Sequence, residues 1–298
     1  MRNANVIIFG AGGQVGKALT RAASDYGFHP IALGSADADI TDPARLAELA
    51  KEFPLAPVIN AAAYTAVDKA ETEVDAAFAI NAVAPATIAA LFADRPIIHY
   101  STDYVFSGEG ETPFSPEDET APLGVYGLSK RVGELAILKA PQGFVLRTAW
   151  VYGTDGNNFL KTMIRVGRQR GALNVVDDQH GTPTHADDIA QASFALLAAH
   201  RAGATEAMPG LYHLTGNGQT TWHGFAAEIF VALEKQTGEA IGLTAIPSTA
   251  YPTPAKRPAF SVLDCSKIDN VPGVERPQWE TRVAATVKAV LDAEKASS

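Results

Sequence analysis

The sequence has few of the features of exported, nucleic-acid-binding or disulfide-stabilised proteins. It holds one cysteine, Cys265, which excludes an internal disulfide and fits a reducing compartment. Its 24 basic residues stand against 33 acidic ones, and a net charge of −9 disfavours nucleic acid or an anionic membrane as partner. The apolar run at residues 6–10 is too short for the core of a signal peptide. We therefore expect a cytoplasmic protein that binds neither nucleic acid nor membrane.

The longest apolar stretch also lacks the character of a membrane span. Residues 76–93 are rich in alanine, contain Asn81 and Pro85, and follow several acids, so they predict a buried helix. The chain of 298 residues, 47% of them hydrophobic, is long enough for one large domain or two closely packed ones.

What the sequence does contain is a regular alternation through residue 150. Short β-branched runs alternate with longer helical patterns, which predicts right-handed βαβ units and a parallel sheet covered on both faces. The fold class is therefore α/β, a Rossmann-type doubly wound parallel sheet. The predicted strands are residues 6–9, 31–33, 58–60, 97–100 and 144–147, and the predicted helices are residues 14–24, 43–52, 74–92 and 125–138.

This alternation ends after Trp150. Glycine and asparagine cluster at residues 153–158, and prolines interrupt residues 247–258. We expect a Rossmann domain over residues 1–152 and a smaller C-terminal substrate-binding lobe over residues 153–298, with some segments returning to the sheet. Helices are predicted in this part near residues 187–200, 222–235 and 282–293.

A glycine-rich turn follows the first predicted strand and opens the first helix. Gly10, Gly13 and Gly16 would let the chain turn tightly, let the backbone approach a pyrophosphate, and let the helix pack on the strand. The spacing is G-x-x-G-x-x-G instead of the more common G-x-G-x-x-G. Directly after an N-terminal apolar strand it predicts dinucleotide binding, with a purely structural turn as the alternative.

The end of the second strand bears on the choice of dinucleotide. Residues 33–35 lack the carboxylate that would bind the adenosine ribose and repel a 2′-phosphate, which favours NADPH and leaves NADH open. Asp39 and Ile40 are expected to flank the adenine. Small residues after the third strand would let the cofactor lie close, although tight helix–sheet packing accounts for them equally; they are Ala61, Ala62 and Ala63.

A Tyr-x-x-x-Lys pair, Tyr126 and Lys130, lies downstream of Thr102. On a helix the four-residue step places both side chains on one face, where the ammonium would lower the pKa of the phenol. The pair by itself is common on helices. Together with the glycine turn and the Thr102 hydroxyl it predicts the proton-donating group of a carbonyl reductase.

These motifs together resemble the extended short-chain dehydrogenase/reductase family. The resemblance spans nearly the whole chain, which makes it specific. The segments that carry it are residues 9–16, 60–71, 99–106, 126–130, 147–153, 156–159, 178–183, 251–254 and 257–258.

The resemblance implies a role for each matching residue. Thr102, Tyr126 and Lys130 would be catalytic, and Tyr126 and Lys130 would also bind the cofactor, an NADPH that reduces the ketone of a nucleotide-bound sugar. The other cofactor contacts would come from Gly10, Gly13, Gln14, Val15, Gly16, Asp39, Ile40, Ala61, Ala62 and Ala63. The sugar site would comprise Val67, Thr102, Asp103, Tyr104 and Trp150, with Arg257 on the diphosphate. A reductase for a different nucleotide-ketosugar and a non-catalytic regulatory subunit on the same scaffold are the alternatives.

One departure from related patterns concerns the reaction. Dehydratase relatives carry a pair of acids after the threonine, whereas here Asp103 is followed by Tyr104, so reduction without elimination is expected. Trp150 either shapes the sugar site or belongs to the core.

The other departures concern metals. The spacing of His180, His185, Asp187 and Asp188 fits no strong ligand pattern, and a loop with a helix cap explains it better, so no metal ligands are predicted. Some family members join two subunits through Mg²⁺ with a glutamate on the first helix. Ala18 stands at that position, which argues against bound Mg²⁺ and favours a monomer.

Overall fold

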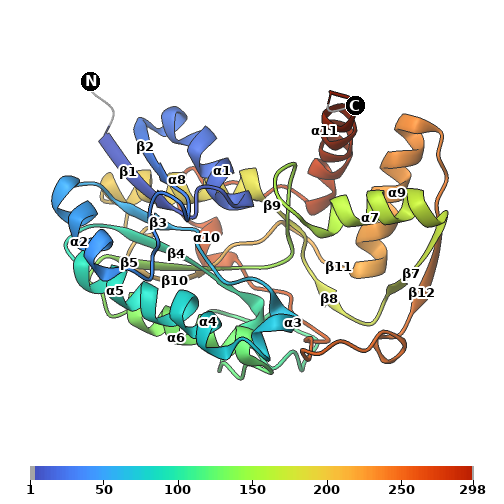
Figure 1. Ribbon diagram of the computed structural model, residues 1–298, viewed down its shortest axis with the longest axis horizontal. Helices are drawn as coiled ribbons and strands as arrows, with labels where there is room; N and C mark the ends of the chain where they lie inside the picture. The colour runs from blue at the N-terminus through green and yellow to red at the C-terminus, as the bar shows by residue number, and fades with distance from the viewer. Residues whose placement is uncertain (1–3, 297–298) are drawn as a thin grey trace.

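A six-stranded parallel sheet forms the centre of the larger part of the molecule in the computed structural model, which describes residues 4–296 (Figure 1). The strand order is β10-β5-β4-β3-β1-β2. This confirms the predicted Rossmann-type doubly wound fold. The strands are β1 (Ala4–Phe9), β2 (Phe28–Leu33), β3 (Val58–Asn60), β4 (Ile97–Thr102), β5 (Gly143–Thr148) and β10 (Gly210–His213).

The strand order indicates where a ligand would bind. The chain runs from β1 outward to β2 and then crosses back to β3 on the other side of β1. In open parallel sheets, ligands bind outside the carboxyl ends of the strands at such a reversal of order. The glycine turn after β1 and the alanines after β3 both lie at this point.

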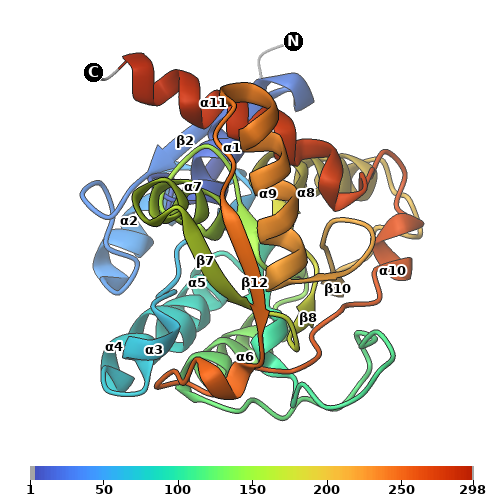
Figure 2. The same cartoon turned by 90° about the vertical axis from the view of Figure 1, so that its right-hand side faces the viewer.

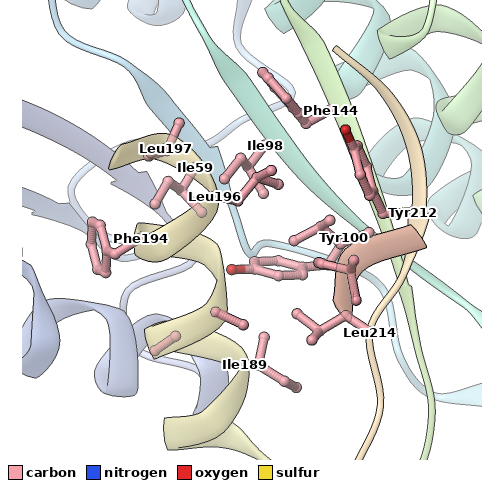
Figure 3. Packing of buried hydrophobic residues seen from close by; sticks show 14 of the residues in the cluster. Ile59, Ile98, Tyr100, Phe144, Ile189, Phe194, Leu196, Leu197, Tyr212 and Leu214 are labelled. Atoms are coloured by element: carbon pink, nitrogen blue, oxygen red, sulfur yellow. The ribbon is translucent and has the colours of Figure 1, made fainter. Parts of the chain in front are cut away.

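Helices cover both faces of the sheet, as predicted. On one face lie α1 (Gln14–Ala22) and α8 (Ala186–Arg201), and on the other α2 (Pro43–Glu52), α5 (Ala84–Leu91) and α6 (Val125–Ile137). Figure 3 shows the first face, where the ring of Tyr100 lies between the sheet and α8. The Tyr100 hydroxyl is 2.6 Å from the Ser193 hydroxyl of α8, so this buried polar group is satisfied.

The apolar stretch at residues 74–91 is one bent helical segment. It consists of α4 (Val74–Phe78), a π turn (η2, Ala79–Val83) and α5, and it is the one helix of the described residues long and apolar enough to span a membrane by length and composition. It packs against α6. Only 33% of it is buried, so the prediction of a buried helix is correct for its inner face alone.

A second group of elements lies beyond the sheet, on the right in Figure 1 and toward the viewer in Figure 2. Its core is formed by α7 (Phe159–Arg170), α9 (Trp222–Thr237) and α11 (Val283–Ala296), with the parallel pair β7 (Ala172–Val176) and β12 (Gly242–Ile246). Two short pairs connect it to the sheet. They are β6 (Val151–Tyr152) with β9 (Thr184–His185), and β8 (His180–Gly181) with β11 (Thr220–Thr221). Short helices α3 (Val67–Ala70) and α10 (Ser266–Asp269) complete the fold.

Candidate active site

The glycine turn has the geometry of an anion site. Gly13 precedes α1 without a side-chain cap, and the first turn of α1 carries no acid, so its backbone N–H groups are free to bind an anion. Gly10 has a φ of +73°, and a Cβ there would lie 2.5 Å from the backbone N of Ala62. A Cβ on Gly16 would lie 2.1 Å from the carbonyl oxygen of Gly10. Only glycine permits this approach, and the turn fits a pyrophosphate.

The adenosine end of the predicted cofactor site holds a carboxylate that the sequence analysis did not place there. Asp37, which follows β2, accepts a hydrogen bond from the Gly34 N–H at 2.9 Å, so a carboxylate does lie beside this strand end. Asp39 is exposed and accepts hydrogen bonds from the backbone N–H and hydroxyl of Thr41, which lower the pKa of its carboxyl. Ile40 is buried in the core.

Thr102 and Tyr126 come together at the carboxyl end of β4. The Thr102 hydroxyl donates a hydrogen bond to Asp103 Oδ1 at 2.9 Å. Burial raises the pKa of Tyr126 to about 12, against the lowering effect of a hydrogen bond with Thr102. The expectation that Lys130 lowers this pKa is wrong, since the lowering contribution comes from Thr102 and burial outweighs it.

Lys130 is buried one turn further along α6. Its Nζ donates to the carbonyl oxygen of Tyr100 at 2.5 Å. Burial lowers the pKa of Lys130 to about 8, while the negative charge of Glu134 acts in the opposite direction. Lys130 is therefore an ammonium held in a poorly solvating site.

A buried ion cluster on α6 and β5 lies next to Lys130. Glu134, fully buried, accepts two hydrogen bonds of 2.8 Å from the guanidinium of Arg147 on β5, and a third of 2.8 Å from Arg131. Arg147 also lies over the ring of Phe106 at 4.9 Å. These contacts keep the pKa of Glu134 below its ordinary value in spite of burial. The cluster holds α6 against β5 and therefore fixes the position of Lys130 on α6.

Asp103 and Tyr104 lie beside this pair. Burial raises the pKa of Asp103 to about 6, and its Oδ2 has no hydrogen-bond partner. The ring of Tyr104 meets that of Tyr126 edge-on, with centroids 5.6 Å apart. A buried carboxylate oxygen without a partner is a ready acceptor for a ligand hydroxyl.

A cavity of about 530 Å³ opens in the second group of elements. Its lining combines aromatic and apolar side chains with two arginines, a composition suited to a nucleoside diphosphate. Arg257 Nη2 lies 3.1 Å from Asp68 Oδ2, next to Val67 on α3, and its Nε has no partner. The principal lining residues are Phe159, Arg170, Gln179, Trp222, Tyr251, Thr253 and Arg257.

Trp150 reaches this cavity indirectly. Its ring stacks on that of Trp222 with centroids 3.6 Å apart, and Trp222 lines the cavity. Trp150 has a φ of +47°, in the left-handed region that non-glycine residues seldom adopt. Such strain persists only where surrounding contacts enforce it. The sequence analysis did not predict Trp222 as a site residue. The one signal for it was its position at the start of a predicted helix.

A loop at residues 153–158 connects β6 to α7 and contacts α1. Asn158 caps α7 through its Oδ1 and donates from Nδ2 to Gln14 Oε1 at 2.9 Å. Arg21 of α1 bridges Asp155, at 2.6 Å, and Asp187 of α8, at 2.8 Å. We call this set of contacts the α1 latch. It places the loop beside the glycine turn.

In the histidine and acid motif of residues 180–188, His185 caps α8, while His180 lies in β8. His185 Nδ1 accepts the N–H of Asp187 at the start of α8, and Asp188 pairs with Arg282 at 2.6 Å. Within residues 4–296, no three acid, histidine or cysteine side chains are grouped to hold a metal ion.

The fold defines the protein's class, an extended short-chain dehydrogenase/reductase. Residues 4–291 match the family model described as "RmlD substrate binding domain". A relative from Salmonella typhimurium named dTDP-4-dehydrorhamnose reductase is 40% identical over 292 residues, covering 94% of this chain and 95% of its own. The chain therefore belongs to the dTDP-4-dehydrorhamnose reductase family.

Solved structures agree with this assignment. A dTDP-4-dehydrorhamnose reductase from Clostridium acetobutylicum superposes with a TM-score of 0.88 at 35% identity, covering 96% of this chain and 99% of its own. The corresponding protein from Bacillus anthracis, solved in complex with NADP, gives a TM-score of 0.85 at 30% identity, covering 95% and 98%.

Proposed function

We propose that the protein reduces the C4 ketone of dTDP-4-dehydro-L-rhamnose to dTDP-L-rhamnose with NADPH. The observation that carries the proposal is the meeting of Tyr126 and Thr102 at the carboxyl end of β4. This is the edge of the sheet at which the glycine turn also lies. The names of the relatives, and the NADP bound to one of them, support the same substrate and cofactor.

The chemistry assigned to the chain is proton donation. NADPH, when bound against the glycine turn and Lys130, supplies the hydride. As negative charge gathers on the C4 oxygen, Tyr126 donates its proton there and Thr102 donates a hydrogen bond. A phenol with a pKa of about 12 stays protonated at neutral pH, as an acid in the reducing direction requires. Thr102 must turn its hydroxyl from Asp103 to the sugar.

The substrate roles extend from this centre to the cavity. Asp103, through its partnerless Oδ2, would accept a sugar hydroxyl, and Tyr104, Val67 and Trp150 would shape the sugar site. Arg257 would bind the diphosphate through the donors that Asp68 leaves unused. The nucleoside would occupy the cavity of about 530 Å³.

Further proposals concern the cofactor and the setting. The glycines at 10, 13 and 16 with Gln14 and Val15 would contact the pyrophosphate, while Asp39, Ile40 and residues 61–63 would line the rest of the cofactor site.

We place the boundary between the Rossmann domain and the substrate lobe at residue 152, and the protein in the cytoplasm. The pairing of Arg21 with Asp187 supports a protein without an Mg²⁺ bridge at this position.

The test compares the wild type with Tyr126→Phe. The wild type should oxidise NADPH with dTDP-4-dehydro-L-rhamnose, and NMR of the product should show dTDP-L-rhamnose. The variant should lose on the order of 10² to 10⁴ in kcat and keep its NADPH affinity within a few-fold. Turnover with a UDP-linked ketosugar in place of the dTDP compound would favour a different reductase. No turnover with any ketosugar, despite NADPH binding, would favour a regulatory subunit.

A further inference from the structure

A carboxylate from a distant part of the chain caps the helix that carries Tyr126 and Lys130. Gly124, the residue before α6, has no side chain to serve as a cap, and the first turn of α6 holds no acid. The first backbone N–H groups of a helix have no partner within the helix. Glu71 Oε1 accepts one of them, the N–H of Val125, at 2.9 Å. The cap of α6 therefore comes from 54 positions earlier in the sequence.

The backbone at the start of α6 leaves space for this carboxylate. A Cβ on Gly124 would lie 2.4 Å from Glu71 Oε1, and the nearest atoms to it beyond its chain neighbours all belong to Glu71. Gly124 has a φ of −152°, in the extended region open to any residue, so its conformation does not require glycine. The carboxylate that lies against it accounts for glycine at this position.

Glu71 is itself held by a short helix that contacts Arg257. It directly follows α3, which packs against α6. Asp68 on α3 accepts hydrogen bonds from the N–H of Ala255 at 3.2 Å and from Arg257 Nη2 at 3.1 Å. Ala70, the residue before Glu71, is fully buried. These contacts anchor α3, so the carboxylate reaches α6 from a fixed base.

The capped N–H lies next to the proton donor in the chain. Tyr126 follows Val125 in the first turn of α6, and helix ends fray when their N–H groups lack partners. Lys130 lies one turn further along and is held separately, by its hydrogen bond to the carbonyl oxygen of Tyr100. Loss of the cap would therefore displace the phenol of Tyr126 more than the ammonium of Lys130. A displacement of about 1 Å at a reacting group can lower the rate about a hundredfold.

We propose that Glu71 is a positioning residue for the reduction, because its carboxylate caps α6 at Val125 and so holds Tyr126 at the sugar ketone. This role rests on the proposed function, in which Tyr126 donates the proton. A negative charge at this end of α6 also matches the positive end of the helix dipole. Glu71 ends the segment 60–71, one of those that carry the family resemblance.

Steady-state kinetics with dTDP-4-dehydro-L-rhamnose and NADPH test the proposal. Glu71→Ala removes the cap and should lower kcat by about tenfold to a hundredfold, with the Kd of NADPH unchanged. Glu71→Gln keeps an oxygen that can accept the Val125 N–H, so it should retain kcat within about threefold. Asp42→Ala removes the side-chain cap of α2, a helix without catalytic residues. It is the matched control and should keep the kcat of the wild type.

Gly124→Ala displaces the carboxylate without removing it. Its Cβ would lie against Glu71 Oε1, so kcat should fall as in Glu71→Ala, and Glu71→Ala/Gly124→Ala should fall no further. Hydrogen exchange over residues 124–130, followed by mass spectrometry, should be faster than in the wild type in all three variants and unchanged in Asp42→Ala. If circular dichroism shows that Glu71→Ala does not fold, Gly124→Ala carries the same test.

Failure of the proposed function and failure of this role give different results. A wild type that does not turn over the dTDP compound would reject the proposed function, while hydrogen exchange would still decide whether Glu71 holds the first turn of α6. Glu71→Ala with the kcat of the wild type, or with wild-type exchange over residues 124–130, would overturn the role of Glu71. An equal loss of kcat in Asp42→Ala would overturn it too, because the effect would then be one of general stability.

Discussion

Replacing Lys130 with methionine should stabilise the protein at neutral pH while it removes activity. The structure holds this ammonium in a buried site, where it donates one hydrogen bond, to the carbonyl oxygen of Tyr100. Methionine keeps the apolar stem and removes the charge. Burial of this ammonium therefore costs stability, as burial of active-site charges commonly does.

The magnitude follows from the pKa. Lowering the pKa of Lys130 from 10.5 to about 8 corresponds to a folded-state cost of about 3 kcal/mol while the group is charged. Methionine removes this cost, but it also removes the hydrogen bond to Tyr100, and that loss offsets about 1 kcal/mol of the variant's gain in stability. At pH 7 the variant should thus be more stable by about 2 kcal/mol.

The pH dependence carries a definite sign. Below pH 8 the folded and unfolded wild-type chains both carry the ammonium, so the folded state bears the whole cost. Between pH 8 and 10.5 the unfolded chain holds a proton that the folded chain has released, so wild-type stability from this group rises with pH. Methionine does not titrate. The variant's advantage should therefore shrink by about 3 kcal/mol across that window.

Urea unfolding at pH 7, 8.5 and 10 measures this difference directly. Other titrating groups are shared by both proteins and cancel in the comparison. Lys51→Met, at an exposed position on α2, is the control and should show no such trend. An advantage that stays constant with pH, or a variant less stable than the wild type at pH 7, would refute the reasoning.

Two further predictions concern packing. Arg147→Leu should lower the free energy of unfolding by about 3 to 5 kcal/mol in urea titrations, because it leaves Glu134 buried with only Arg131 as its partner. The double variant Arg147→Leu/Glu134→Leu should recover most of this loss. If it does not, the uncompensated charge of Glu134 is not the cause. Gly181→Ala would place a Cβ 2.5 Å from Trp150 Cε2 and displace its ring, so the KM for the sugar nucleotide should rise about tenfold with an unchanged Kd for NADPH. An equal loss of affinity for the sugar nucleotide and for NADPH would show that Trp150 does not belong to the sugar site.

The elements that the sequence predicted well are those whose signal is local. The β-branched runs mark β1 to β5 within a few residues, and Pro43 behind the capping Asp42 marks the start of α2. Helix α7 was missed because it begins inside a glycine and asparagine cluster. Asn158, its cap, is recognisable only once its Oδ1 is seen on the N–H of Lys161.

The parts of the site that could not be predicted depend on burial and on distant segments. A Tyr-x-x-x-Lys spacing places Tyr126 and Lys130 on one face, but it does not report how deeply the fold buries them, and burial decides both pKa values. Trp222 lies 72 positions after Trp150, and no local pattern pairs them. Asp37 reaches Gly34 only through the path of its loop.

The α1 latch gives the cofactor and the substrate a shared mechanical element. Gln14 belongs to the glycine turn and also accepts a hydrogen bond from Asn158, which caps the helix that forms one wall of the cavity proposed for the nucleoside. A dinucleotide that stabilises the turn is therefore expected to stabilise that wall as well. Because such coupling is reciprocal, we expect the sugar nucleotide to lower the Kd of NADPH by the same factor by which NADPH lowers the Kd of the sugar nucleotide.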